Sequence, residues 1–193
     1  ILDIACNDGT FLENFTKKNF INVIGVEPAK NLRNLNKKKN IKINTFFFNY
    51  KSSFLLKKKY QNFKLITANN VCAHIPDVDN FFKGIKNILN TNGIFVFEVS
   101  YLLDVINKLT FDTIYHEHMS YHALKPLIRF AKKNDLQVFD FDLIKAQGGS
   151  IRVYVSHLGS KKIKEKKIKK QILLENKKGL FSEALYFQYM RRI

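Results

Sequence analysis

The chain has 193 residues, and 46% of them are hydrophobic, which is enough to build one domain of ordinary size with a sizeable core. Its formal net charge is +17, but nearly all of the excess is lysine. Only five residues are arginine, the side chain that forks onto phosphates and bases. We therefore expect a solvated basic surface and no nucleic-acid partner.

No apolar run approaches the ~20 residues of a membrane span, so no membrane partner is expected either. The two cysteines, Cys6 and Cys72, lie in segments predicted to be interior and lack the spacing of metal ligands. These features predict a cytoplasmic protein with no metal site in this chain. Because the first residue already belongs to a predicted strand, we expect the chain to be a fragment.

The first predicted elements are a strand, a tight turn of small residues and an amphipathic helix over 10–18, all within ILDIACNDGT and the residues after it. A strand–turn–helix of this kind offers free backbone N–H groups to the polar end of a nucleotide-like cofactor. The next strand, over 22–27, ends in Glu27, whose carboxylate suits the two hydroxyls of a ribose. Ala5 and Asn7 stand where a dinucleotide site has glycines, so the turn favours a nucleoside without a pyrophosphate, and S-adenosylmethionine is the commonest. An ordinary turn followed by a chance acid is the alternative.

The remaining elements alternate between helices and strands. We predict helices over 28–39, 51–60, 77–89, 123–134 and 161–178, and strands over 44–48, 63–68, 94–99, 136–144 and 150–157. The alternation ends in a hairpin-like pair, so the fold class is α/β: a seven-stranded, Rossmann-like class I methyltransferase sheet with helices on both faces.

Two segments depart from this alternation. Residues 100–122 are too long for a plain connection and are rich in aromatic, acidic and histidine side chains. The lysine-rich helix over 161–178 is predicted to leave the domain with its lysines in solvent. We therefore predict a methyltransferase domain over 1–158 and the helical start of a second domain over 159–193.

Polar side chains are predicted to gather where the strands end. The carboxyl ends of parallel strands form one edge of such a sheet, and ligands bind outside that edge. The residues expected there are Asn7, Asp8, Glu27, Asn69, Asn70, His74, Tyr115, His116, Glu117, His118 and Tyr121. We assign Asn69 to the cofactor, and Asn70, His74 and Tyr121 to the methyl acceptor.

The run Tyr115-His116-Glu117-His118 carries the predicted catalytic groups. An imidazole suits proton transfer near neutrality, so His118 is the candidate base. Glu117 supports developing positive charge, and Tyr115 donates to an oxyanion. A surface loop whose histidines have no function is the alternative. His74 either touches the acceptor or hydrogen-bonds the loop, and the sequence favours neither.

Six stretches together resemble the nucleotide-sugar C-methyltransferases, over roughly residues 1–157. They are IACNDGTFL, GVEPAKNL, TANNVCAHIPD, FEVSYLLD, FDTIYHEHMSY and GGSIRVYV, in this order and spacing. These enzymes act on 4-keto deoxysugars. The resemblance implies that a first set of residues lines the methionine part of S-adenosylmethionine, that Glu27 binds its ribose, and that a second set lines the sugar site. The first set is Asp3, Ala5, Asn7, Asp8 and Gly9, and the second is Asn70, His74, Tyr115, Glu117 and His118.

The resemblance also implies a mechanism, in which His118 removes the proton beside the 4-keto group and the resulting carbanion takes the methyl group. Family members carry an N-terminal zinc-binding module and a second α/β domain, so zinc is expected only outside this chain. The alternatives are an O- or N-methyltransferase of another small metabolite and, from charge alone, an RNA-binding or RNA-modifying protein. The turn Asn69-Asn70-Val71-Cys72 argues against the last, because it lacks the prolines expected beside a modified base.

Overall fold

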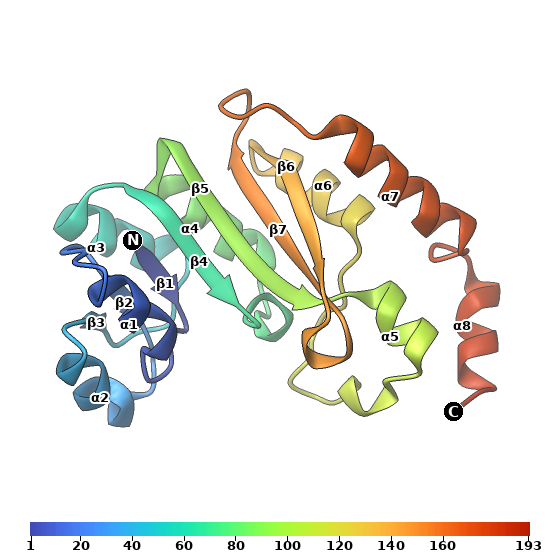
Figure 1. The fold of residues 1–193 in the computed structure, drawn as a ribbon, viewed down its shortest axis with the longest axis horizontal. Coiled ribbons are helices and arrows are strands. Elements are labelled where there is room, and N and C mark those ends of the chain that lie inside the picture. Colours follow the sequence, from blue (N-terminus) through green and yellow to red (C-terminus); the bar gives the residue numbers. More distant parts are fainter.

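The computed structural model describes residues 1–193 and contains a seven-stranded sheet in the order β3-β2-β1-β4-β5-β7-β6 (Figure 1). The strands are β1 (Leu2–Ile4), β2 (Ile24–Val26), β3 (Lys42–Asn44), β4 (Phe63–Asn69), β5 (Leu89–Ser100), β6 (Leu136–Ile144) and β7 (Ser150–His157). All pairings from β3 to β5 are parallel, and β7 is antiparallel to both β5 and β6. The predicted α/β sheet of seven strands is confirmed, including its closing antiparallel pair.

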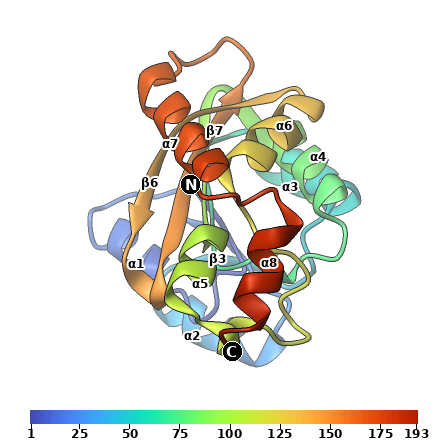
Figure 2. The same ribbon diagram turned by 90° about the vertical axis from the view of Figure 1, so that its right-hand side faces the viewer.

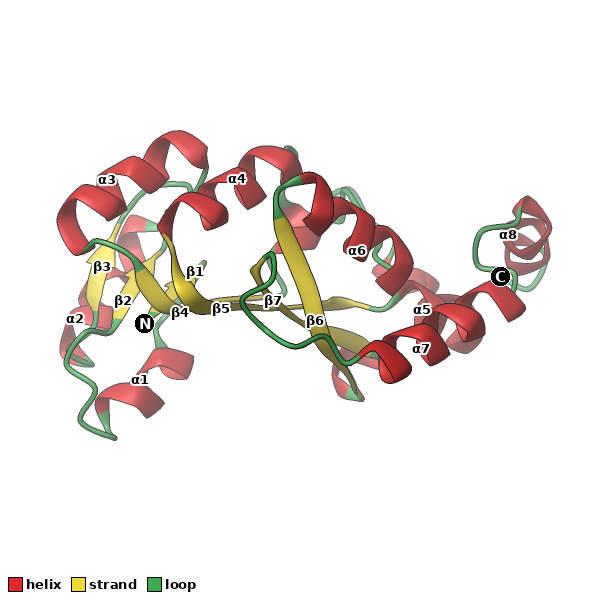
Figure 3. Cartoon of the chain, turned by 90° about the horizontal axis from the view of Figure 1, so that it is seen from above, coloured by secondary structure: helices red, strands yellow, loops and turns green.

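Helices cover both faces of this sheet. They are α1 (Thr10–Thr16), α2 (Arg33–Lys38), α3 (Tyr50–Tyr60), α4 (Val78–Ile88), α5 (Leu102–Lys108), α6 (Leu124–Lys133), α7 (Glu165–Lys177) and α8 (Glu183–Met190). Figure 3 shows α3, α4 and α6 on one face, with α1 and α2 on the other. No helix is both long and apolar enough to cross a membrane.

The core under α4 consists of interlocked phenylalanines. Phe82 of α4 packs edge-to-face on Phe95 and on Phe97 of β5, with ring centroids 5.7 Å apart in both cases. Phe81 packs edge-to-face on Phe48, which precedes α3, at 5.3 Å. Edge-to-face contacts of this kind add to the burial energy of the rings. They fix α3 and α4 against the sheet, and the chain segments that enter these two helices lie at the carboxyl edge of the strands.

Both helices begin at side-chain caps. Asp77 accepts a hydrogen bond from the backbone N–H of Asn80 at the start of α4. Asn49 and Ser52 form a reciprocal capping box at the start of α3. Because the caps fix where each helix begins, they also fix the loops that lead out of β3 and β4.

The predicted third strand, over 44–48, is wrong in its position. The strand covers Lys42–Asn44, and the aromatic residues after it form a loop. The apolar run has the composition of a strand, but Phe48 is buried against Phe81 of α4 while Phe47 is 76% exposed. Only one of the two phenylalanines is packed, and the run forms a loop whose composition sequence periodicity cannot distinguish from a short strand.

Other predicted boundaries also change. The helix predicted over 28–39 is a 3₁₀ turn, Lys30–Leu32, followed by the short α2. The predicted loop over 100–122 contains α5, and α8 is an element that the sequence analysis did not anticipate. Beyond residue 158 the chain remains in contact with the sheet, because α7 buries Ile168, Gln171 and Glu175. Figure 2 shows α8 beside α5.

Candidate functional site

The turn after β1 is built from left-handed backbone conformations. Ala5, Asn7 and Gly9 have φ values of 56°, 51° and 78°. A Cβ at Gly9 would lie 2.4 Å from Ile41 Cδ1 and 2.5 Å from Asn36 Oδ1, so this position requires glycine for space as well as for φ. The Asn36 side chain, which is fully buried, also donates to the carbonyl of Asn7 at 2.7 Å. Helix α2 therefore holds the turn in place.

Glu27, at the end of β2, meets this turn. Its Oε2 accepts from the N–H of Asn7 at 3.0 Å, and its Oε1 accepts from the N–H of Ala29 at 2.9 Å. The side chain is buried, with 8% of the residue exposed. Each carboxylate oxygen accepts one backbone N–H and keeps a lone pair free. The carboxylate is thus rigidly placed and can still accept hydroxyl groups, as the sequence predicts for a ribose.

Asp3 lies inside β1, where its Oδ1 accepts from Thr67 Oγ1 at 2.6 Å. Burial raises the pKa of Asp3 to about 7, and the hydrogen bond from Thr67 opposes that rise. Asp3 is 4% exposed and does not line the cavity described below. Its hydrogen bond joins β1 to β4, and its predicted contact with a cofactor stays a prediction.

Several predicted cofactor residues do not line the cavity described below: Asn7, Asp8, Gly9, Glu27 and Asn69. Asp8 accepts from Thr10 N at 3.0 Å and from Thr10 Oγ1 at 2.7 Å, and it pairs with Lys39 at 3.2 Å. These hydrogen bonds and the lysine lower the pKa of the Asp8 carboxyl. Asn69, at the end of β4, is paired in register with Glu98 of β5. The structure places neither side chain in the cavity.

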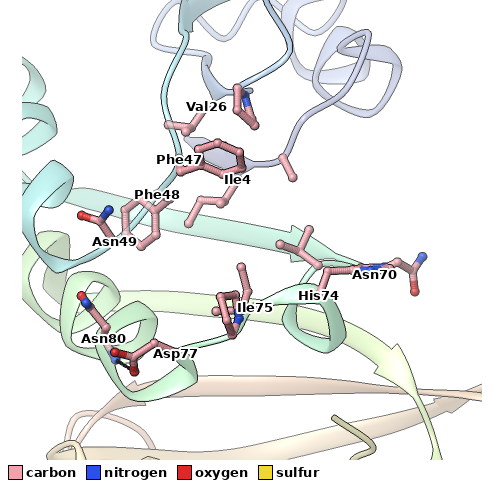
Figure 4. Close-up of a pocket in the computed structure, with 14 residues that line it drawn as sticks. Ile4, Val26, Phe47, Phe48, Asn49, Asn70, His74, Ile75, Asp77 and Asn80 are labelled. Carbon is pink, nitrogen blue, oxygen red and sulfur yellow. Dashed lines mark hydrogen bonds between the residues drawn. The ribbon is translucent and has the colours of Figure 1, made fainter. Parts of the chain in front are cut away.

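A cavity of about 550 Å³ opens at the carboxyl ends of β1 to β4 (Figure 4). It is lined by Ile4, Ala5, Val26, Pro28, Phe47, Phe48, Asn49, Asn70, Val71, His74, Ile75, Pro76, Asp77 and Asn80. Figure 4 shows Phe47 and Phe48 facing Ile75 across the cavity, with Asn70 and His74 at one end. A largely apolar hollow with a few polar groups at its ends is typical of a small-molecule site.

The sequence analysis missed much of this lining. Phe47, Phe48 and Asn49 follow β3, and Asp77 and Asn80 begin α4. Their signal is positional: an apolar run directly after a strand of a parallel sheet reaches the same edge as the turns after β1 and β2. The prediction of a longer third strand concealed that signal, because it put the phenylalanines inside the sheet.

Beside the cavity, the predicted acceptor residues form one cluster. The ring of His74 lies 4.9 Å from the ring of His118, measured between centroids. Tyr115 packs on His118 at 4.3 Å, and Tyr121 meets it edge-on at 6.2 Å. His74 lines the cavity as well, so it joins the two parts of the site. The structure therefore brings His74, Tyr115, His118 and Tyr121 together, and Asn70 lines the same cavity as His74. Their roles toward an acceptor stay a prediction.

Hydrogen bonds fix the imidazole of His118. Its Nδ1 lies 2.7 Å from the carbonyl oxygen of Thr113, and its Nε2 lies 3.1 Å from the hydroxyl of Tyr115. A carbonyl oxygen only accepts, so Nδ1 carries the proton and Nε2 of the neutral ring accepts from Tyr115. Tyr121 donates to the same Thr113 carbonyl at 3.0 Å. Nε2 is therefore the basic atom, and a tyrosine hydroxyl is its partner.

Glu117 does not support His118 directly. Its side chain is 63% exposed, and its carboxylate lies nearest to His116 Nε2, at 3.9 Å, while the side chain of His116 is 90% exposed. What Glu117 contributes is its backbone: its carbonyl accepts from His74 Nδ1 at 3.0 Å. The N–H of Met119 likewise donates to Ala73 O at 2.8 Å. These two bonds attach the loop to the chain after β4, and they realise the hydrogen-bonding alternative for His74.

Comparison with known proteins decides the family. The sequence profile of a family described as "Methyltransferase domain" matches residues 1–140. The chain belongs to this family. Over 156 residues, the methyltransferase domain is 30% identical to C-methyltransferase NovU from Streptomyces niveus. The match covers 81% of this chain and 37% of NovU, so the chain spans well under half the length of that relative.

Solved methyltransferase structures share the fold. A SAM-dependent methyltransferase from Anabaena variabilis superposes on the domain with a TM-score of 0.63 and 15% identity, covering 81% of this chain and 76% of the other. Magnesium protoporphyrin IX methyltransferase from Synechocystis, solved with bound SAH, superposes with a TM-score of 0.61 and 8% identity, covering 81% and 73%. These likenesses confirm the predicted class I methyltransferase fold.

The site of the methyltransferase domain fits S-adenosylmethionine, the cofactor that the sequence predicts. Its apolar walls suit an adenine ring. Glu27 does not line the cavity itself, but it bonds the turn that carries Ala5, and the lone pairs left free on its carboxylate suit the two ribose hydroxyls. The left-handed turn brings Ala5, which has only a small side chain, to the cavity lining. The domain is thus built as an S-adenosylmethionine-dependent methyltransferase.

Proposed function

We propose that the domain transfers a methyl group to a carbon atom beside the 4-keto group of a nucleotide-linked deoxysugar, as part of a longer protein. One observation carries the proposal: the cluster of His118, Tyr115 and Tyr121 adjoins the cofactor cavity through His74. A base next to the methyl donor is what carbon methylation requires, because a carbon acceptor is a poor nucleophile until it loses a proton.

The cofactor supplies an electrophilic methyl group on a sulfonium sulfur. Phe47, Phe48 and Ile75 would hold the adenine between apolar walls, and Glu27 would accept from the ribose hydroxyls. Asn70 and His74 line the end of the cavity nearer the cluster. They would therefore flank the methyl group and the acceptor. The protein's contribution is then to orient the acceptor and to move one proton.

The proton moves to Nε2 of His118. Thr113 O already accepts from Nδ1–H. This hydrogen bond would stabilise the positively charged imidazolium that forms when Nε2 takes a second proton. The Tyr115 hydroxyl turns from Nε2 to the enolate oxygen, where it donates. The electron pair released by the C–H bond would then form the new C–C bond to the methyl group, while the S–CH₃ bond breaks and leaves its electron pair on the sulfur.

The sugar acceptor rests on the sequence motifs and on the relative. The motif FDTIYHEHMSY supplies every member of the cluster except His74, and the relative with 30% identity is named as a C-methyltransferase. Glu117 keeps its predicted role only through solvent or after rearrangement of its side chain, since its carboxylate lies away from His118.

Proton exchange tests this function without methyl transfer. In deuterated water, with S-adenosylhomocysteine in place of the donor, the full-length protein should exchange the acidic proton of a nucleotide-linked 4-keto deoxysugar. His118→Asn keeps much of the size of the ring but cannot take the proton, so exchange should slow by about 10²–10⁴. His116→Asn is the matched control: this neighbouring histidine is 90% exposed, and its variant should exchange like wild type.

Two results would contradict the proposal in different ways. Exchange that persists in His118→Asn and vanishes in His74→Asn would move the base to His74. If the full-length protein neither exchanges nor methylates any 4-keto sugar, carbon methylation is wrong, and methylation of oxygen or nitrogen on another small metabolite takes its place.

A further inference from the structure

A buried carboxylate on α7 lies at the centre of a hydrogen-bond network. Glu175 is 0% exposed, and its oxygens accept from the Tyr101 hydroxyl at 2.8 Å, from Leu124 N at 2.7 Å and from Lys125 N at 3.1 Å. Gln171, one turn earlier on α7, donates to the Tyr101 oxygen at 2.7 Å. A buried charge is stable only when such partners surround it. We call these five residues the Glu175 network.

The network caps a helix that has no cap of its own. Leu124 and Lys125 are the first two residues of α6, and the N-cap residue Ala123 has no side-chain acceptor. The first amides of a helix need acceptors, and a negative charge is favoured there by the helix dipole. Glu175 meets both needs from another helix, so the start of α6 is held by α7.

The same network also holds the first end of residues 102–123, which we call the acceptor segment. Tyr101 lies where β5 passes into α5, and its N–H donates to Gly149 O at 3.0 Å. The next residue, Leu102, donates to His122 O at 2.9 Å. Residues 102–123 therefore leave and return at one point, where the Glu175 network joins Tyr101 to Leu124. Tyr115, His118 and Tyr121 all lie within this segment.

Inside the segment, the acceptor groups depend mainly on each other. His118 and Tyr121 both bond to Thr113 O, which belongs to the same segment. The hydrogen bonds from 115–119 to the chain after β4 are those that involve His74 and Ala73. Besides these two hydrogen bonds, the position of the cluster relative to the cofactor cavity also depends on how the two ends of the segment are held.

We infer that Glu175 is a positioning residue: through Tyr101 and the first amides of α6, it holds the segment of residues 102–123 so that the acceptor cluster faces the cofactor cavity. The inference rests on the proposed function only in calling the cluster the acceptor site.

The test compares Tyr101→Phe and Glu175→Gln with Glu165→Gln, an exposed glutamate on the same helix whose only partner is Lys169. Tyr101→Phe removes one hydroxyl and keeps the buried ring, so it tests the network if Glu175→Gln does not fold. Three quantities are measured on the full-length protein: amide hydrogen exchange over 109–122, the tautomer of His118 by nitrogen NMR, and the affinity for S-adenosylhomocysteine.

In Tyr101→Phe and Glu175→Gln, we expect exchange over 109–122 to accelerate by about tenfold or more, which is the effect of losing a hydrogen bond to a charged group. The His118 spectrum should show a mixture of tautomers, while cofactor affinity stays within about twofold of wild type. Glu165→Gln should match wild type in all three quantities.

Unchanged exchange over 109–122 in both variants would overturn the inference, even if the melting temperature falls, because Glu175 would then only hold α7 on α6. A loss of S-adenosylhomocysteine affinity as large as the change in exchange over 109–122 would overturn it too, because the effect would then not be specific to the acceptor cluster. None of these measurements uses an acceptor. The role of the Glu175 network can therefore be confirmed even if the protein methylates no keto sugar. It can also be refuted even if the protein exchanges the sugar proton.

Discussion

Asp3 is an acid held inside a sheet, and its ionisation should affect stability. Its pKa is raised to about 7 by burial, against an ordinary value of 3.8. Between these two values the folded chain keeps a proton that the unfolded chain has lost, so the stability from this group falls as pH rises from 4 to 7. The slope is about 1.4 kcal/mol for each pH unit inside that window.

Asp3→Asn tests this effect, because the amide keeps the size of the side chain and does not titrate. Urea unfolding at pH 5 and pH 7 should show that wild type loses stability relative to the variant across the window. Parallel curves for the two proteins would show that Asp3 ionises in the folded state as readily as in the unfolded chain.

At the scale of one element, the turn into α1 depends on Gly9 for two reasons, and Gly159 separates them. Both glycines have positive φ, at 78° and 73°, but a Cβ at Gly159 meets nothing within 4 Å, whereas one at Gly9 meets Asn36 and Ile41. Gly159→Ala should lower the free energy of unfolding by about 1 kcal/mol, from backbone strain alone. Gly9→Ala should lower it by about 2–4 kcal/mol, since overpacking adds to the strain.

Chemical denaturation of the two variants measures that difference, and calorimetry with S-adenosylhomocysteine adds a second readout. Gly9→Ala should weaken binding because the turn and its amides shift, whereas Gly159→Ala should bind like wild type. Equal losses of stability would mean that Asn36 and Ile41 move aside and that glycine serves this turn by its φ alone.

For the whole molecule, the formal charge of +17 should not produce a nucleic-acid site. Several lysines are paired with acids: Lys39 with Asp8 at 3.2 Å, Lys83 with Asp79 at 2.6 Å, and Lys167 with two aspartates at 2.8 and 2.9 Å. Fluorescence anisotropy at about 150 mM salt should therefore detect no tight binding of labelled RNA or DNA. Nanomolar binding that weakens steeply with salt would contradict this prediction.

The sequence by itself determined the order of the elements and most of the acceptor cluster. Short apolar runs suit buried strands, and the amphipathic segments between them have one apolar face only when they are helical. Their alternation therefore predicts a doubly wound sheet. In such a sheet the strand ends share one edge, so the positions of Asn70 and His74 on the lining of one cavity followed from chain order. The closing strand pair was equally predictable, because its two strands are neighbours in the sequence.

Only the tertiary structure decided how the parts of the site are held. Phe47 and Phe48 line the cavity from a loop that is held where Phe48 packs on Phe81 of α4, and no local pattern separates that loop from a strand. The side chain of Glu117 faces solvent and not His118, and it is the backbone carbonyl of this residue that bonds His74. Glu175 lies more than 50 positions after Tyr115, in a run of lysines that reads as a solvated helix. Its burial depends on contacts between distant segments, which the period of one helix does not encode.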